Sequence, residues 1–256
     1  MKKNSFNLDN KNIIITGGSG FLGSQIVDAF LNERANVYII DLQKPKKKSS
    51  VKYFKSDITN EDDLKIILNF FKKKKLKIDV LINNAAIDYL PKKSKNKSLK
   101  LESFPNDLWE KDISVSLTGS YLCTKIFGSY MSKMKKGNIL NISSDLGIIA
   151  PDQRIYKNTN FIKPVTYSVV KHGIIGLTKY TASYWGKNNI RCNAIAPGGI
   201  FNNQDKSFIK RIKQLIPLGR MAKKNEYNAL VLFLCSDLSS YLTGSIVVAD
   251  GGRTII

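Results

Sequence analysis

The sequence predicts a single α/β domain spanning residues 1–256, in which a doubly wound parallel sheet of about seven strands carries helices on both faces. Three observations predict this class. Short β-branched segments alternate with amphipathic helical segments along the chain. A glycine-rich turn joins the first strand to the first helix, and later strands end in polar residues. The 256 residues and the hydrophobic content of 43% can also bury a sizeable core.

The first strand, turn and helix carry the strongest local signal. Residues 11–16 form a β-branched strand, and the turn that follows has glycines three positions apart, at Gly17, Gly20 and Gly23. Such glycines allow a tight turn and let backbone N–H groups approach a pyrophosphate at the N-terminus of the next helix. The apolar pattern extends that helix to about Arg34. The segment therefore predicts a dinucleotide phosphate site.

The second strand, residues 36–40, ends in Asp41, which lies 18 residues beyond Gly23. A carboxylate in this place accepts hydrogen bonds from the adenosine ribose and repels a 2′-phosphate. This favours NAD over NADP as the cofactor. NADP is the alternative, because the lysines of residues 44–48 could fold over its 2′-phosphate.

The alternation continues to the end of the chain. Further strands are expected at residues 51–55, 78–83, 137–143, 189–195 and 245–249. Further helices are expected at about residues 59–75, 105–135, 164–187, 204–215 and 224–236. Thr59 or Asn60 is expected to cap the first of these helices, because both side chains can accept hydrogen bonds from its free N–H groups. Two long segments, residues 88–104 and 148–163, interrupt the rhythm and are expected to be substrate-side loops.

Tyr167 and Lys171 are four positions apart and therefore lie on one face of a helix. An ammonium beside a phenol favours the phenolate, so we expect the pKa of Tyr167 to lie below its usual value of about 10. A tyrosine with such a pKa can act as an acid or base near neutral pH. Alone, such a pair is also typical of a half-buried surface contact, so its interpretation depends on the rest of the chain.

The net charge of +21 has two interpretations. A basic chain can bind nucleic acid or an anionic surface. Here the lysines are spread along the chain, and their denser runs contain no interleaved aromatic residues and no nucleic-acid-binding motif. This favours solvated surface charge and a protein that binds neither nucleic acid nor membrane. An anionic small-molecule substrate is compatible with the same charge.

The cysteines Cys123, Cys192 and Cys235 are far apart, and each lies in an apolar segment. This predicts buried free thiols in a reducing compartment, with no disulfide framework and no metal site. The sequence has no run of 18 apolar residues, and its first residues lack the apolar core of a signal peptide. We therefore expect a cytoplasmic protein.

Taken together, these residues resemble the classical branch of the short-chain dehydrogenase/reductase family, from Lys11 to Gly252. The motifs that carry the resemblance are Thr16-Gly-Gly-Ser-Gly-Phe-Leu-Gly23, Asp41, Asp57-Ile58, Asn83-Asn-Ala-Ala86, Ser144, Tyr167-x-x-x-Lys171, Pro197-Gly198 and Asp250-Gly-Gly252. The resemblance implies a Rossmann fold and an NAD(P)-dependent oxidoreductase that interconverts a secondary alcohol and a ketone.

The resemblance also implies the site residues. Tyr167 would exchange a proton with the carbinol oxygen, Lys171 would hold the nicotinamide ribose, and Ser144 would hydrogen-bond the substrate oxygen. Ser116 stands where the family has an asparagine of the proton relay, so the relay would be rearranged, weakened or lost. The implied cofactor-binding residues are Gly17, Ser19, Gly20, Phe21, Leu22, Gly23, Asp41, Leu42, Asp57, Ile58, Asn84, Ala85, Ala86, Tyr167, Lys171, Pro197, Gly198 and Ile200.

The chain departs from the family pattern where substrate would enter. Ser144 and Tyr167 are 23 positions apart, farther than is usual, and the extra residues include Arg154, Lys157 and Lys163. These cations would suit an anionic substrate such as a phosphorylated or nucleotide-linked sugar. In residues 145–163 and 216–221 the chain is similar to oxidoreductases of surface-sugar or flagellin-glycan biosynthesis.

Three expectations complete the interpretation. Asp145 and Asp152 lie near the mouth of the site, and we favour solvated loop acids over a substrate role. The helices at 105–135 and 164–187 resemble those through which the family forms homodimers and homotetramers. The alternatives to an enzyme are a catalytically weak nucleotide-binding regulatory protein on the same fold and, less favoured, a basic nucleic-acid-binding protein.

Overall fold

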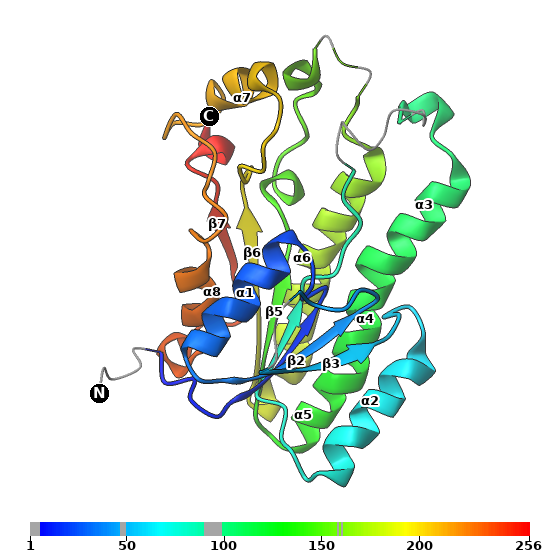
Figure 1. The fold of residues 1–256 in the computed structure, drawn as a ribbon, viewed down its shortest axis with the longest axis vertical. Coiled ribbons are helices and arrows are strands. Elements are labelled where there is room, and N and C mark those ends of the chain that lie inside the picture. The colour runs from blue at the N-terminus through cyan, green and yellow to red at the C-terminus, as the bar shows by residue number, and fades with distance from the viewer. Residues whose placement is uncertain (1–5, 47–49, 90–98, 158, 160) are drawn as a thin grey trace.

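The computed structural model describes residues 6–46, 50–89, 99–157, 159 and 161–256. Its centre is a seven-stranded sheet with the order β3-β2-β1-β4-β5-β6-β7, in which all neighbouring strands are parallel (Figure 1). The strands are β1 (Asn12–Thr16), β2 (Asn36–Asp41), β3 (Val51–Lys55), β4 (Val80–Asn83), β5 (Gly137–Ile142), β6 (Ile190–Pro197) and β7 (Ile246–Ala249). The predicted α/β class with a parallel sheet is confirmed.

The strand order reverses between β1 and β4. The chain runs outward from β1 through β2 to β3, and it then returns to the other side of β1 with β4. At such a switch point a crevice forms outside the carboxyl ends of the strands, and it is there that open parallel sheets bind ligands. The fold therefore places the residues that follow β1 and β4 at the expected ligand edge.

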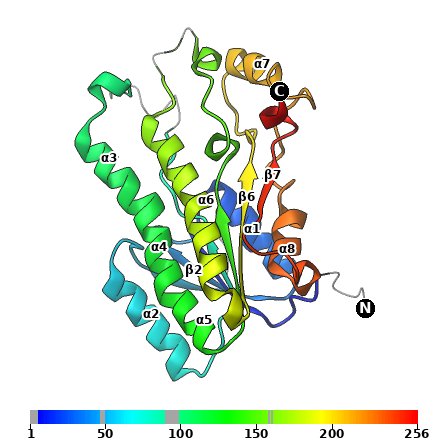
Figure 2. The same cartoon turned by 180° about the vertical axis from the view of Figure 1, so that it is seen from behind.

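Helices cover both faces of the sheet (Figure 1, Figure 2). One face carries α1 (Phe21–Asn32) and α8 (Asn228–Cys235). The other carries α2 (Glu61–Lys73), α6 (Val165–Trp185) and a long helical stretch between them. A short helix, α7 (Lys206–Lys213), lies beyond the carboxyl ends of the strands (Figure 1).

The core explains why the strands are rich in β-branched residues. Ile13 and Ile15 pack into the hydrophobic cluster under α1 and α8, and Ile14 packs into the cluster on the opposite face. All three are fully buried. A strand buried on both faces needs apolar side chains at consecutive positions, because successive side chains point to opposite faces.

The helical stretch predicted at 105–135 is continuous but not regular. It consists of α3 (Asn106–Ile113), α4 (Gly119–Cys123) and α5 (Ser129–Lys133), joined by π-helical turns at Ser114–Thr118 and Thr124–Gly128. Such wide turns are frequent near functional sites. The first of them contains Ser116.

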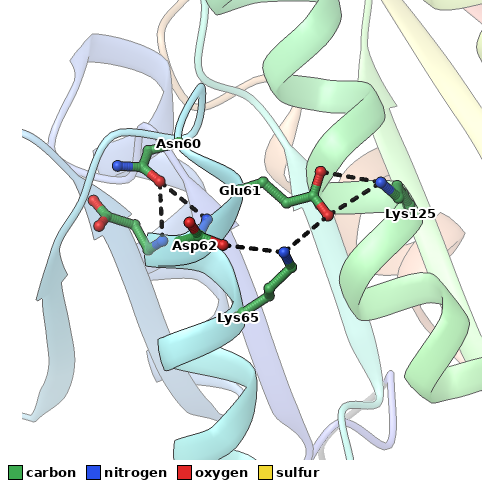
Figure 3. A network of polar contacts seen from close by, with 6 residues as sticks. Asn60, Glu61, Asp62, Lys65 and Lys125 are labelled. Atoms are coloured by element: carbon green, nitrogen blue, oxygen red, sulfur yellow. Dashed lines mark hydrogen bonds and ion pairs between the residues drawn. The ribbon is translucent and has the colours of Figure 1, made fainter.

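The N-terminus of α2 is fixed by the network shown in Figure 3. Asn60 Oδ1 accepts the N–H groups of Asp62 and Asp63 at 3.0 and 3.2 Å, so Asn60 is the cap. Glu61 binds Lys125 of the second π turn at 3.0 Å, which ties α2 to the long helical stretch. Exposed ion pairs add little stability. The network orients the end of the helix that follows Asp57 and Ile58.

A third hydrophobic cluster forms a cap beyond the carboxyl ends of the strands. It consists of Leu99, Ile155, Tyr156, Phe161, Ile212, Ile216 and Met221. The segment 148–163, predicted as a substrate-side loop, contributes a short 3-10 helix and three buried side chains to this cap. Most of the other predicted loop, at 90–98, lies outside the described residues.

The structure also bears on the cysteines, on metal-binding side chains and on membrane-spanning helices. The three cysteines are buried free thiols. Within the described ranges, no group of three His, Cys, Asp or Glu side chains is placed to hold a metal ion. In the same part of the chain, no helix combines the length and the apolar character needed to cross a membrane.

Candidate active site

A cavity of about 1200 Å³ runs along the carboxyl ends of the strands. It brings together nearly all of the residues that the sequence predicted for the site. Those that line it are Gly17, Ser19, Gly20, Phe21, Leu22, Gly23, Asp41, Leu42, Asp57, Ile58, Asn84, Ala85, Ala86, Ser144, Tyr167, Lys171, Pro197, Gly198 and Ile200. Ser116 is the predicted residue that the structure does not bring to the cavity.

The turn after β1 leaves room for a phosphate group. Gly17 has a φ of +65°, and a Cβ at that position would lie 2.8 Å from Ala85 Cα. A Cβ on Gly23 would lie 2.1 Å from the Gly17 carbonyl oxygen. No side chain caps the N-terminus of α1, so its first N–H groups are free to bind an anion. The residues present therefore fit the pyrophosphate of a dinucleotide.

Asn84 holds this turn against the end of β4. Its Nδ2 donates to the carbonyl oxygens of Thr16 and Gly17 at 3.1 and 3.0 Å. Thr16 Oγ1 in turn accepts the N–H groups of Asn84 and Ala85, each at 3.1 Å. These bonds fix the relative position of the two strand ends at the switch point.

Asp41 lies in front of the glycine turn at the end of β2. Its Oδ2 accepts the Ser19 N–H and its Oδ1 accepts the Gln43 N–H, each at 2.9 Å. The carboxylate is half-buried and lines the cavity. A second lone pair on each oxygen remains for the hydroxyls of a ribose. Of the nearby lysines, Lys44 and Lys46 are exposed, and 47–48 lie outside the described residues.

Ser144, Tyr167 and Lys171 meet at the other end of the cavity. Ser144 follows β5, while Tyr167 and Lys171 lie one turn apart on α6. Lys171 Nζ donates to the Ile142 carbonyl oxygen at 2.9 Å, and the side chain is buried. Tyr167 is accessible from the cavity and is otherwise surrounded by protein. Two hydroxyls and an ammonium thus converge where a reacting oxygen can bind.

Burial controls the protonation of this pair. It raises the pKa of Tyr167, and the Asp88 carboxylate adds to the rise. It lowers the pKa of Lys171 to about 8. The expected fall in the pKa of Tyr167 is wrong for this geometry, because desolvation of the buried phenol has the largest effect and raises the pKa.

A second lysine reaches Tyr167 from the segment 148–163. Lys163 Nζ lies 3.6 Å from the centroid of the Tyr167 ring and 2.6 Å from Asp88 Oδ1. Of the other predicted cations, Arg154 is exposed and pairs with Asp152, and Lys157 is exposed as well. Only the lysine at position 163 of the three therefore faces the cavity.

Asp145 and Arg253 form a buried ion pair at the cavity, which sequence reasoning missed. Arg253 Nη1 donates to Asp145 Oδ2 at 2.7 Å. The expectation that Asp145 is a solvated loop acid is wrong, because its side chain is 4% exposed. The two residues are 108 positions apart, so no local pattern indicates the contact.

Ser116 takes a structural place in the long helical stretch. Its hydroxyl accepts the Ile87 N–H at 3.0 Å, and its carbonyl oxygen accepts the Ser120 hydroxyl at 3.0 Å. The residue is buried beside the segment that follows β4. The expectation that a relay through Ser116 is rearranged, weakened or lost stays a prediction, because a hydroxyl that accepts the Ile87 N–H can still donate its own proton.

The comparisons with known proteins agree with this architecture. A family model described as enoyl-(acyl carrier protein) reductase matches residues 19–254. The chain belongs to the short-chain dehydrogenase/reductase family. It is 30% identical to the NAD-dependent glycerol dehydrogenase of Listeria innocua, over 98% of this chain and 96% of the relative. It is 32% identical to the 3-oxoacyl-[acyl-carrier-protein] reductase FabG of Thermotoga maritima, over 97% and 99%.

A solved structure shows the same fold throughout. The short-chain dehydrogenase of Leptospira borgpetersenii, determined with bound NAD+, superposes on this short-chain dehydrogenase/reductase with a TM-score of 0.90 and 34% identity. The match covers 99% of this chain and 96% of that one. The protein is therefore an NAD(P)-dependent oxidoreductase of the classical branch with a Rossmann fold.

Proposed function

We propose that this dehydrogenase/reductase interconverts a secondary alcohol and a ketone on a small substrate of the sugar class, with NAD as its cofactor. One observation carries the proposal. A single cavity has the glycine turn and Asp41 at one end and Ser144, Tyr167 and Lys171 at the other. A dinucleotide bound along the carboxyl edge of the sheet would have its nicotinamide beside these three side chains.

The protein groups position the substrate and move the proton, while the bound cofactor supplies the hydride chemistry. Tyr167 donates its phenolic proton to the ketone oxygen in reduction and accepts it back in oxidation. Ser144 donates a hydrogen bond to the same oxygen. Lys171 compensates the negative charge that remains on Tyr167 after the proton has left.

The choice of NAD over NADP rests on Asp41. Its carboxylate is held by two backbone N–H groups and cannot turn away from the cavity without losing both. A ribose 2′-hydroxyl can donate to it, whereas a 2′-phosphate would be repelled. Among the described neighbours, Lys44 and Lys46 are the cations that could compensate such a phosphate, and both are exposed.

The substrate end of the cavity suits a hydroxylated and anionic molecule. Lys163 supplies a cation beside Tyr167, and residues 202–204, which are Asn-Asn-Gln, line the same space. In this structure the Asp88 carboxylate pairs with Lys163, so an anionic group of a substrate would have to take the place of that carboxylate at the Lys163 ammonium. A phosphorylated or carboxylated sugar offers such a group together with a secondary alcohol.

The expected homodimer or homotetramer belongs to the same proposal. Tyr180 and Tyr184 on α6 are 67% and 65% exposed and stack at 5.7 Å. Two large exposed aromatic rings on the outer helical face support an interface there. Sedimentation of the protein as a monomer at micromolar concentration would contradict this part.

The alternative is a catalytically weak nucleotide-binding protein with the same fold. Ser116 favours it, because it stands where the family has the asparagine of the proton relay and it does not line the cavity. The two proposals differ in turnover and agree in cofactor binding.

The deciding experiment compares Tyr167→Phe with Tyr241→Phe, a matched change at a fully exposed tyrosine. Turnover of sugar and polyol substrates is followed by NADH absorbance, with NADPH in parallel. For an enzyme, we expect Tyr167→Phe to lower the turnover rate by a factor of about 10² or more, while Tyr241→Phe leaves the rate unchanged. Cofactor binding without turnover in the unaltered protein would favour the alternative.

A further inference from the structure

The ion pair between Arg253 and Asp145 lies directly beside Ser144. Its N–O distance is 2.7 Å, and the two side chains are 5% and 4% exposed. A buried ion pair is weak evidence for stability, because an apolar pair of the same shape is often as stable. Its position beside Ser144 instead points to a role in the chemistry of the site.

The second carboxylate oxygen of Asp145 holds the Ser144 hydroxyl. Ser144 Oγ lies 2.8 Å from Asp145 Oδ1, and the same oxygen accepts the Leu146 N–H at 2.8 Å. An ionised carboxylate can only accept hydrogen bonds, so the serine is the donor in this contact. The hydroxyl must leave Asp145 before it can donate to a substrate oxygen.

Arg253 affects how strongly the Asp145 carboxylate holds the hydrogen bond from the Ser144 hydroxyl. With the guanidinium on Oδ2, the carboxylate charge is compensated, and Oδ1 keeps the Leu146 N–H when the hydroxyl turns away. Without Arg253, an uncompensated carboxylate would hold the Ser144 proton and repel the negative charge that develops on the substrate oxygen. Both effects act on the reacting atoms through Asp145.

The C-terminal turn brings Arg253 to this place. Asp250 accepts the N–H groups of Gly252 and Thr254 at 2.9 and 2.7 Å. Gly251 and Gly252 have φ values of +71° and +91°, a backbone region that favours glycine. The turn directs Arg253 inward, where its side chain is buried and lines the cavity. The Asp250-Gly-Gly252 motif therefore places the Arg253 side chain at the active site.

We propose that Arg253 is a positioning residue, which binds Asp145 and thereby frees the Ser144 hydroxyl to donate to the substrate oxygen. The part of Ser144 in turnover rests on the proposed function. The electrostatic part is that Arg253 compensates the negative charge of Asp145 and so weakens its effect on a group at position 144. This part can be measured without any turnover.

The substrate-independent test uses the thiol introduced by Ser144→Cys as a probe of charge at that position. The rate of its alkylation by iodoacetamide is measured against pH, because the thiolate is the reactive form. The natural cysteines give little background, since all three are buried and burial raises their pKa values. The unaltered protein measures that background.

Three proteins are compared: Ser144→Cys alone, with Arg253→Met, and with Arg253→Met and Asp145→Asn together. We expect Arg253→Met to raise the midpoint of the profile by about one pH unit or more, because the uncompensated carboxylate opposes a thiolate. Adding Asp145→Asn should reverse the rise. Equal midpoints in the first two proteins would overturn the proposal.

A variant that keeps the size of the side chain covers the case in which Arg253→Met does not fold. Asp145→Asn in the Ser144→Cys protein removes the negative charge and leaves the guanidinium, so the midpoint should fall by about one unit. An unchanged midpoint would overturn the proposal as well. Circular dichroism and NAD titration establish that each variant is folded.

Turnover then tests the consequence for catalysis. Loss of an oxyanion donor typically costs about 10²–10³ in kcat, so we expect Arg253→Met to lower kcat at least about tenfold with little change in the KM for NAD. Arg253→Met with Asp145→Asn should recover much of that loss. A lower melting temperature with unchanged kcat would show a structural role and overturn the proposal. An inactive unaltered protein would contradict the proposed function alone, because the alkylation result still decides the role of Arg253.

Discussion

The ammonium of Lys163 lies over the ring of Tyr167, 3.6 Å from its centroid, while its charge is paired with Asp88 at 2.6 Å. The side chain of Lys163 is 10% exposed and that of Asp88 is 51% exposed. The carboxylate is therefore the partner that can be displaced into water, and the lysine is the partner that remains at the site. The anionic substrate that we propose would therefore meet Lys163 beside Tyr167.

Replacing Lys163 with methionine should affect anionic substrates most. Hydrogen bonds to charged groups contribute about 1.5–3 kcal/mol, so we expect the KM of a phosphorylated or carboxylated sugar to rise about tenfold or more. The KM of a neutral polyol should change much less. The matched control is Lys157→Met, an exposed lysine of the same segment. An equal loss for neutral and anionic substrates would show that Lys163 acts by packing on Tyr167 instead.

Asp41 should decide the cofactor preference. In Asp41→Ser the carboxylate that would repel a 2′-phosphate is gone, and so is the acceptor for the ribose hydroxyl. We expect the affinity for NAD to fall about tenfold and that for NADP to rise, which quenching of intrinsic fluorescence measures with each cofactor. Asp9→Ser, at an exposed aspartate outside the cavity, is the control. Tighter binding of NADP than NAD by the unaltered protein would refute the argument.

The features that the sequence predicts well are those with a local physical cause. The strand at Val51–Lys55 has the predicted bounds, because a β-branched and aromatic run between turns has few other folds available. Asn60 caps α2 as expected, because its side chain reaches the N–H groups two and three positions on. The glycine turn and Asp41 face one cavity because parallel strands place their carboxyl ends at one edge.

The features that sequence reasoning missed depend on contacts between distant segments. In the sequence, Asp145 has the features of a loop acid, because its partner Arg253 lies 108 positions away and only the fold brings the two together. The pKa of Tyr167 depends on how much water the folded cap excludes, which the spacing to Lys171 does not reveal. Ser116 has the expected position in the chain, but the π turn directs its hydroxyl to the Ile87 N–H.

Lys171 should make ketone reduction sensitive to pH near 8. Burial lowers the pKa of its ammonium to about 8 and raises that of Tyr167, so the tyrosine keeps its proton while the lysine loses its charge. The phenolate left after proton transfer then has no compensating cation. We expect kcat/KM for ketone reduction to fall above about pH 8, by about tenfold per pH unit.

The control for this profile is Lys171→Arg, because a guanidinium stays charged throughout the range. The variant is expected to be slower, since its side chain must fit a buried position beside the Ile142 carbonyl oxygen. Its profile should nevertheless lose the inflection near pH 8. An inflection that persists in Lys171→Arg would belong to another group and would remove Lys171 from the explanation.

Two glycine-to-alanine changes separate cofactor binding from folding. In Gly23→Ala the new Cβ would lie 2.1 Å from the Gly17 carbonyl oxygen, so the turn must open and the N–H groups at the start of α1 must move. We expect NAD binding to weaken by more than about tenfold, together with some loss of stability. Gly176→Ala lies within α6 and has no neighbour within 4 Å, so it should stabilise the protein by up to about 1 kcal/mol and leave NAD binding unchanged. Isothermal titration with NAD and thermal melts measure both effects, and undiminished NAD binding in Gly23→Ala would show that the cofactor does not depend on this turn.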